Sequence, residues 1–301
     1  MELDIDKLKE FSNIELLAKQ LVEGFITGLH KSPYHGFSVE FAEHRLYNYG
    51  ESTRHIDWKV FAKTDRLYTK RYEEETNLRC FLILDNSSSM YYPQPGYGKI
   101  KFSILASAAL AFLLQKQRDA VGLYTFSDEI EVQTEVKSTA THVHKLLIEL
   151  QKIFDGEKTS KKTNVPAVLH QIARNIHKRS LVIIFSDMFQ QTDNQDEIFS
   201  ALQHLKHNRH EVLLFHVNDK NTELEFDFED RPYKFHDLET GQVLKLTPTE
   251  IKQAYKEKMS TFYKELFLKC SQLKIDFVDA NIHDGLDKIL SSYLIKRTKM
   301  R

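Results

Sequence analysis

From residue 78 onward, short and continuously apolar segments alternate with segments of helical periodicity. The run Cys80-Phe81-Leu82-Ile83-Leu84 contains no polar residue, which is typical of a strand buried on both faces of a sheet. Further strands are expected at 121–126, 180–185, 212–217 and 275–278, and helices at 100–117, 141–154, 164–177, 195–207, 249–273 and 284–296. Such an alternation predicts a mostly parallel sheet with right-handed crossovers and helices on both faces.

Two segments depart from this alternation. Residues 129–136 follow a tight turn at Ser127-Asp128 and place apolar side chains at every second position, which predicts an antiparallel edge strand. Residues 219–247 are polar but contain four aromatic rings and the turn Glu239-Thr240-Gly241, and they predict an inserted β-rich subdomain. The predicted fold class is therefore α/β and Rossmann-like, with one antiparallel edge strand.

The N-terminal part of the chain has a different texture. Ser12-Asn13-Ile14-Glu15 has the spacing of a capping box and predicts the start of a helix. Residues 34–75 are rich in aromatic and charged side chains and predict short strands and turns, with Trp58 in a core or a subdomain interface. We therefore expect two domains: an N-terminal helix and aromatic-rich segment at 1–77, and the α/β domain at 78–301 with its insertion at about 219–247.

Composition restricts the cellular setting. The net charge of -1 gives no overall attraction to nucleic acid or to a membrane surface. The two cysteines, Cys80 and Cys270, form no CxxC pair, so neither a disulfide framework nor a thiolate zinc site is expected. The start of the chain lacks the pattern of a signal peptide, and no apolar run reaches the roughly 18 residues of a membrane span. We expect a soluble, cytoplasmic protein.

Basic residues gather at the end of the chain. Lys296, Arg297, Lys299 and Arg301 have no acidic residue nearby in the sequence. A charge run of this kind usually forms the solvated end of a helix, which is the prediction for these residues.

Polar loops are expected to meet at one edge of the predicted sheet. In such sheets ligands bind beyond the carboxyl ends of the strands, near the point where the strand order reverses. There the chain offers one carboxylate and two hydroxyls in Asp85-Asn86-Ser87-Ser88-Ser89, a second carboxylate at Asp187, and the hydroxyl of Thr163. Because hard cations prefer oxygen ligands, we predict that Asp85, Ser87, Ser89, Thr163 and Asp187 hold Mg²⁺ or another divalent cation.

These residues match a known pattern. The Asp85-x-Ser87-x-Ser89 loop, together with Thr163-Asn164 and Asp187, resembles the metal-ion-dependent adhesion site of von Willebrand factor A domains. The segments Gly36-Phe37-Ser38-Val39-Glu40-Phe41 and Arg54-His55-Ile56-Asp57-Trp58 resemble the bacterial family called domain of unknown function 58. That resemblance implies a von Willebrand factor A-like fold and an association with MoxR-type AAA+ ATPases. It thus implies a non-enzymatic adaptor or co-chaperone that binds its partner through an acidic side chain on the metal.

Other functions fit less well. Gly96-Tyr97-Gly98-Lys99 stands where a phosphate-binding loop would, but Pro93 and Ile100 violate the Walker pattern. Histidines at 204, 207 and 210 are spaced by three, yet are expected to lie exposed on one helix and not to bind zinc. A metal-dependent hydrolase acting on phosphate esters remains the alternative; the interaction module is favoured because the loops show no paired general base or nucleophile set.

Overall fold

The computed structural model describes residues 13–30, 44–47, 58–70, 78–93, 98–156, 164–189, 195–237 and 242–299. The chain divides into two compact units. The larger unit combines Met1–Gly24 with Leu78–Arg301, and the smaller is Phe25–Asn77. The division falls inside the first described helix, α2 (Ile14–His30).

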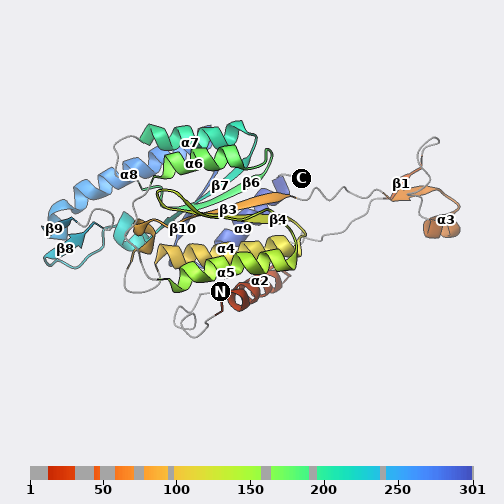
Figure 1. Cartoon of the computed structure of the whole chain (residues 1–301), viewed down its shortest axis with the longest axis horizontal. Helices are drawn as coiled ribbons and strands as arrows, with labels where there is room; N and C mark the ends of the chain where they lie inside the picture. The colour runs from red at the N-terminus through yellow and green to blue at the C-terminus, as the bar shows by residue number, and fades with distance from the viewer. Residues whose placement is uncertain are drawn as a thin grey trace. The chain divides into compact units, whose positions relative to one another are not determined.

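Six strands of the larger unit form one sheet, in the order β10-β7-β6-β3-β4-β5 (Figure 1). The strands are β3 (Arg79–Asp85), β4 (Ala120–Phe126), β5 (Ile130–Gln133), β6 (Leu181–Ser186), β7 (Glu211–Asn218) and β10 (Asp276–Asn281). Every neighbouring pair is parallel except β4 and β5, which are antiparallel at one edge. The predicted α/β class, with a mostly parallel sheet and one antiparallel edge strand, is confirmed.

Helices cover both faces of this sheet (Figure 1). One face carries α6 (Val165–Asn175), α7 (Gln195–His207) and α8 (Pro248–Gln272); the other carries α4 (Lys99–Lys116), α5 (Ala140–Asp155) and α9 (Asp287–Lys299). Because both faces are covered, the interior stretches of the central strands, 80–84 of β3 and 181–185 of β6, have no solvent side and are apolar.

The core follows from this covering. Alternate residues of β3 and β6, such as Ile83 and Ile184, join the cluster beneath α6, α7 and α8. Their neighbours Leu82 and Ile183 are equally buried and belong to the opposite face. Burial of each such side chain stabilises the fold by about 1.5–3 kcal/mol.

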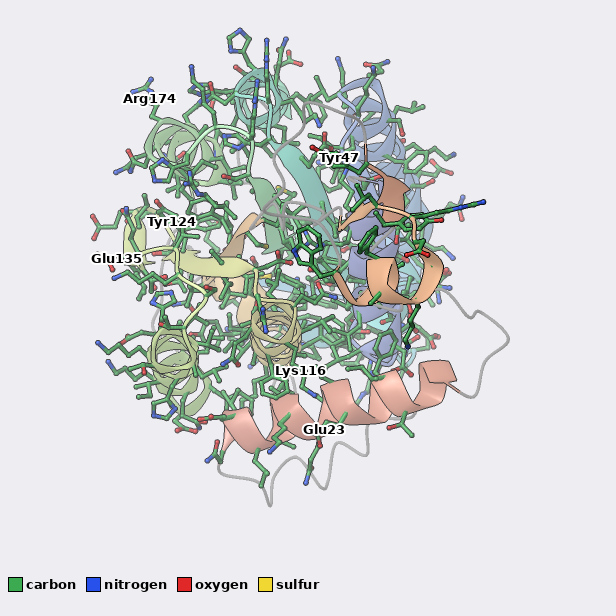
Figure 2. The ribbon with its side chains drawn as sticks, turned by 90° about the vertical axis from the view of Figure 1, so that its right-hand side faces the viewer. Glu23, Tyr47, Lys116, Tyr124, Glu135 and Arg174 are labelled. Carbon is green, nitrogen blue, oxygen red and sulfur yellow. The ribbon has the colours of Figure 1, made fainter. Side chains whose placement is uncertain are left out.

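The helix α2 lies against α4 and α5. Its side-chain cap is Asn13, whose Oδ1 accepts the N–H groups of Glu15 and Leu16 at 2.9 and 3.3 Å; Ser12, named in the predicted capping box, lies outside the described residues. Figure 2 shows α2 running beneath these helices, with Glu23 facing Lys116 at 3.9 Å. The first turns of α2, up to Gly24, are thus part of the larger unit.

The smaller unit contains two short strands, as predicted for this aromatic-rich segment, and a short helix that was not predicted. Strands β1 (His44–Leu46) and β2 (Tyr68–Lys70) pair antiparallel, and α3 (Trp58–Thr64) lies between them in the chain. Trp58 is 60% exposed and meets Phe61 edge to face at 6.1 Å. Because more than half of its side chain is exposed, and its described ring contact is with a neighbour on the same helix, Trp58 does not belong to a buried core.

The segment between β7 and α8 begins with a π-helical turn, η3 (Lys220–Leu224), and contains the hairpin of β8 (Tyr233–His236) and β9 (Val243–Leu246). The four aromatic rings noted in the sequence pack together here, and Phe226 also packs against Tyr255 of α8 in a tilted arrangement, with the ring centroids 4.4 Å apart. These rings give the hairpin a small apolar core of its own, anchored on α8.

The basic C-terminal residues are not simply solvated, and the prediction is wrong for two of them. Lys296 is 8% exposed and lies between Glu211 and Asp276, at 2.6 and 2.7 Å. Arg297 contacts the buried Asp119 at 2.8 Å. The acids that balance these cations come from distant parts of the chain, at the amino ends of the strands, so the local sequence did not show them. Arg301 lies outside the described residues.

Two general expectations can be compared with the described residues. No helix within them is both long and apolar enough to cross a membrane. Cys80 in β3 and Cys270 in α8 are both free and buried, and burial raises the pKa of the Cys270 thiol to about 12.

His210 corrects another expectation. It does not lie on the helix with His204 and His207 but just before β7, where it is fully buried and its Nδ1 accepts the Ser180 N–H at 3.3 Å. Its Nε2 has no hydrogen-bond partner among the described residues. Burial lowers the pKa of His210 below its usual value.

We expect this histidine to make the protein less stable in mild acid. Below about pH 6.5 the unfolded chain binds a proton at His210 that the folded chain resists, so stability falls as pH decreases. In urea unfolding at pH 7.5 and 5.5, His210→Asn, which keeps an acceptor for Ser180, should lose less stability than wild type. The exposed neighbour gives the control, because His207→Asn should behave like wild type; equal losses in all three proteins would contradict the prediction.

Candidate metal centre

The predicted site lies where the strand order of the sheet reverses. The chain leaves β3 toward α4 on one face and leaves β6 toward α7 on the other, so the two loops diverge at the carboxyl edge (Figure 1). Asp85 is the last residue of β3, and Ser186 is the last of the neighbouring β6. The pairing of Leu84 with Phe185 places these two ends side by side. Sheet topology thus brings the Asp85 and Asp187 loops together.

Asp85 is held by both of its carboxylate oxygens. The Ser186 hydroxyl donates to Oδ2 at 2.6 Å, and the Ser87 N–H donates to Oδ1 at 2.9 Å. The loop is fixed further by Asn86, whose amide donates to Glu131 on β5 at 2.7 Å. Asp85 is 1% exposed, so its position is set by these bonds and not by water.

The hydroxyls continue this network toward the second carboxylate. The Oγ atoms of Ser87 and Ser89 are 3.1 Å apart, and the Ser89 hydroxyl forms a hydrogen bond with Asp187. Two adjacent ligands of an octahedral Mg²⁺ with bonds of about 2.0–2.1 Å would be separated by about 2.9 Å. The spacing of the two serine hydroxyls therefore fits a shared hard cation.

Two charged residues that we did not predict complete the centre. Lys99, the first residue of α4, is 1% exposed, and its Nζ lies 2.8 Å from Asp187 Oδ2 and 2.5 Å from Glu223 Oε1. Glu223 belongs to η3, which follows β7. The centre thus draws on three strand ends and the beginning of a helix.

Burial and charge act differently on the two aspartates. Burial and, after it, the charge of Asp187 together raise the pKa of Asp85 to about 6. Burial opposes ionisation of Asp187 as well, but the charge of Lys99 and its hydrogen bond outweigh it and hold that pKa below its usual value. Among the described residues, no cation offsets the charge of Asp85 as Lys99 offsets that of Asp187, so a bound cation would stabilise Asp85 most.

The charges of the centre do not balance. Among the described residues, with all groups ionised, the carboxylates of Asp85, Asp187 and Glu223 face the ammonium of Lys99, which leaves a net charge of -2. One divalent cation would neutralise this charge, and the donor oxygens are of the hard type that Mg²⁺ prefers. The residues present therefore fit the predicted ion in charge, donor type and hydroxyl spacing.

Thr163, the remaining predicted ligand, lies outside the described residues. The next residue, Asn164, is described, and its N–H donates to the carbonyl of Ser127 at 3.3 Å, just after β4. Within the described ranges, no three histidine, cysteine, aspartate or glutamate side chains converge as a metal site. A cation at this centre would thus depend on the serine hydroxyls as well as on carboxylates.

The turn after Asp187 has an unusual backbone. Met188 adopts a φ of 52°, in the left-handed region that favours glycine, and its side chain is fully buried. The Met188 N–H donates to the Ser186 hydroxyl at 2.9 Å, and the Phe189 N–H donates to Asp187 Oδ1 at 3.0 Å. Packing and hydrogen bonds therefore hold a strained turn that orients Asp187.

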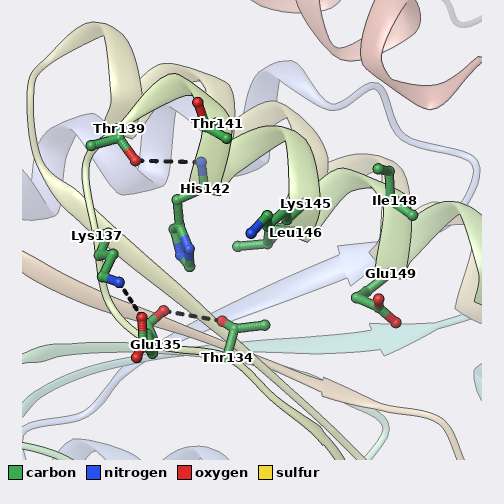
Figure 3. Close-up of a pocket in the computed structure, with 10 residues that line it drawn as sticks. All are labelled: Thr134, Glu135, Lys137, Thr139, Thr141, His142, Lys145, Leu146, Ile148 and Glu149. Carbon is green, nitrogen blue, oxygen red and sulfur yellow. Dashed lines mark hydrogen bonds and ion pairs between the residues drawn. The ribbon is translucent and has the colours of Figure 1, made fainter.

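A separate groove lies elsewhere on the larger unit (Figure 3). It has a volume of about 460 Å³ and runs between α5 and the segment after β5. His142, on its wall, contacts the carbonyl of Val121 at the amino end of β4, so the groove is remote from Asp85. Lys137 and Glu135 on its rim pair with each other, and none of the predicted site residues lines it.

Fold and site together define an α/β domain with an oxygen-lined candidate cation centre at the carboxyl edge of its sheet. The chain belongs to the family described as protein of unknown function DUF58, whose model matches residues 43–264. Uncharacterized proteins of Mycobacterium bovis (Mb1516) and Mycobacterium tuberculosis (Rv1480) are each 25% identical over 219 residues, which is 72% of this chain and 67% of theirs.

Solved structures with a similar fold come from bacteria as well. The conserved hypothetical protein BatB from Bacteroides thetaiotaomicron is 15% identical, with a TM-score of 0.44 over 74% of this chain and 99% of that one. An aerotolerance-related membrane protein from Bacteroides fragilis is 14% identical, with a TM-score of 0.46 over 73% and 99%.

Proposed function

We propose that this chain is a divalent-cation-dependent protein–protein interaction module of the von Willebrand factor A-like type. In this proposal Mg²⁺ is held by Asp85, Ser87, Ser89, Asp187 and Thr163. The observation that carries it is the buried, net negative centre at the point where the strand order reverses. Such a centre is costly to leave without a cation, because buried like charges repel one another.

The same centre favours a ligand from a partner. Serine hydroxyls add no charge, so an ion held by few carboxylates stays electrophilic and attracts a further anionic oxygen. Among the four described ligands, Asp85, Ser87 and Asp187 are buried, and only Ser89 is partly exposed. A partner carboxylate would therefore approach on the side of Ser89.

For the partner, we propose a MoxR-type AAA+ ATPase, with this chain as a non-enzymatic adaptor or co-chaperone in the cytoplasm. Membership in the DUF58 family supports this partner, because proteins of this family are associated with MoxR-type ATPases.

Capture of a purified MoxR-type ATPase tests the proposal. Immobilised wild type should retain the ATPase in Mg²⁺ and release it in chelator, and Ser87→Ala should retain less, because it loses one buried ligand. Ser180→Ala removes an equally buried hydroxyl, bonded to the His177 carbonyl at the amino edge, and should behave like wild type. Equal capture in Mg²⁺ and in chelator would show that no metal bridges the two proteins.

The alternative, a metal-dependent phosphate-ester hydrolase, predicts turnover. We expect none with a generic phosphate ester in Mg²⁺ or Mn²⁺. If wild type hydrolyses the ester and Asp85→Asn does not, the protein is a hydrolase, and the proposal of a non-enzymatic adaptor is wrong.

A further inference from the structure

Lys99 occupies a position that local rules disfavour. It is the first residue of the 18-residue helix α4, where the helix dipole repels a cation, and the first turn contains no acidic residue. It is also buried, which disfavours an ammonium unless anions surround it. Departures from local rules concentrate at functional sites, and the compensation here comes from Asp187 and Glu223.

Glu223 is held as firmly as Lys99. One of its carboxylate oxygens accepts from the Lys99 ammonium, and the other accepts the N–H of Asp219 at 2.8 Å. Its side chain is 21% exposed, so water screens it more than it screens Lys99. Lys99 is thus the counter-ion of two carboxylates: Asp187, which is a proposed metal ligand, and Glu223, which is not.

We propose that Lys99 and Glu223 tune the cation affinity of this centre in opposite directions: Lys99 weakens binding, and Glu223 strengthens it by neutralising Lys99. The inference rests on the proposed function, because it assumes that the centre binds a divalent cation. It assigns Asp85, and not Asp187, as the principal carboxylate for the ion, since Asp187 already pairs with Lys99.

The sign of the effect separates this role from a structural one. A lysine that merely holds Asp187 in place should weaken metal binding when it is removed. A lysine that opposes the metal by charge should strengthen binding when it is removed. Because a unit charge a few ångströms from a divalent ion matters even in a water-like dielectric, we expect about a tenfold or larger change for Lys99.

Titration calorimetry with Mg²⁺ on the full chain provides the test. Lys99→Met should bind Mg²⁺ about tenfold more tightly than wild type, and Glu223→Gln about threefold or more weakly, since Glu223 is better screened. The double variant, with the net charge of -2 restored, should return to within about threefold of wild type. Should Lys99→Met fail to fold, Glu223→Gln and the double variant still test the opposing signs.

The chain offers a matched control. Lys296 is also a buried lysine between two carboxylates, Glu211 and Asp276, but these begin β7 and β10 at the opposite edge of the sheet. Lys296→Met and Glu211→Gln should leave Mg²⁺ affinity unchanged. Weaker binding in Lys99→Met than in wild type, or no change in either Lys99→Met or Glu223→Gln, would overturn the inference alone. No Mg²⁺ binding by wild type would overturn both the inference and the proposed function.

Discussion

Asp85→Asn is expected to weaken Mg²⁺ binding at least about a hundredfold, while making the metal-free protein more stable. The amide oxygen can still accept the Ser87 N–H, and the amide nitrogen, in the place of Oδ2, can donate to the Ser186 hydroxyl oxygen, so the loop should keep its shape. It removes a buried carboxylate whose pKa is raised to about 6 by burial and by repulsion from Asp187, and that repulsion disappears with it. The free energy of unfolding without metal should rise by about 1 kcal/mol or more.

Thermal unfolding with and without Mg²⁺ measures both effects. A ligand at a hundredfold excess over its Kd adds about 2.7 kcal/mol to the stability of wild type, and this gain should disappear in Asp85→Asn. The exposed Asp128, just after the neighbouring strand β4, provides the control, because Asp128→Asn removes the same charge near the same edge. An equal Mg²⁺-dependent gain in wild type and Asp85→Asn would disprove the site.

Asp119→Ala is expected to destabilise the protein by about 3–5 kcal/mol, the usual effect of removing one partner from a buried ion pair. Asp119 is 1% exposed, and its Oδ1 accepts from both Arg297 of α9 and the Leu78 N–H that precedes β3. The substitution leaves the Arg297 guanidinium, only 16% exposed, without this carboxylate. It also removes the link that Asp119 makes between Arg297 of α9 and Leu78, the residue before β3.

Equilibrium unfolding in urea gives the size of this loss. For comparison, Glu149 pairs with Lys152 at 2.7 Å on the exposed side of α5, and Glu149→Ala should cost no more than about 0.5 kcal/mol. In a double-mutant cycle, Asp119→Ala with Arg297→Met should lose less than the sum of the single variants. A loss below about 1 kcal/mol for Asp119→Ala would mean that the pair lies in a more water-like environment than its burial indicates.

The sheet could be predicted because its signal is local. A fully apolar run such as 80–84 has one stable use in a soluble α/β chain, a strand covered on both faces. The alternation after Ser127 likewise predicted the antiparallel edge correctly, because period-two patterning reports a half-buried strand. Because parallel strands end at the same edge of a sheet, the placement of Asp85 and Asp187 at one edge followed without knowledge of any side-chain contact.

The two residues of the centre that the sequence analysis missed, Lys99 and Glu223, have no comparable local signal. Lys99 stood in the Gly96-Tyr97-Gly98-Lys99 segment that we rejected as a phosphate loop, and a lone lysine opening an apolar helix was the only hint of its burial. Glu223 is one acid among several in a polar stretch, and nothing in the sequence distinguishes it. Similarly, Lys296 and Arg297 looked solvated because Glu211, Asp276 and Asp119 are distant in sequence. Tertiary contacts between charges far apart in the chain decide these cases.

The strand order has a practical consequence for fragments of this chain. The family match ends at residue 264, inside α8, whereas the last strand, β10, occupies Asp276–Asn281 and closes one side of the sheet against β7. A fragment cut at 264 would leave the hydrogen-bonding groups of the apolar β7 open to other chains, which is a common route to aggregation. It would also lack the helix that supplies Lys296 to Glu211. The smallest fragment that behaves as a folded monomer must therefore extend well beyond the stretch by which the family is recognised.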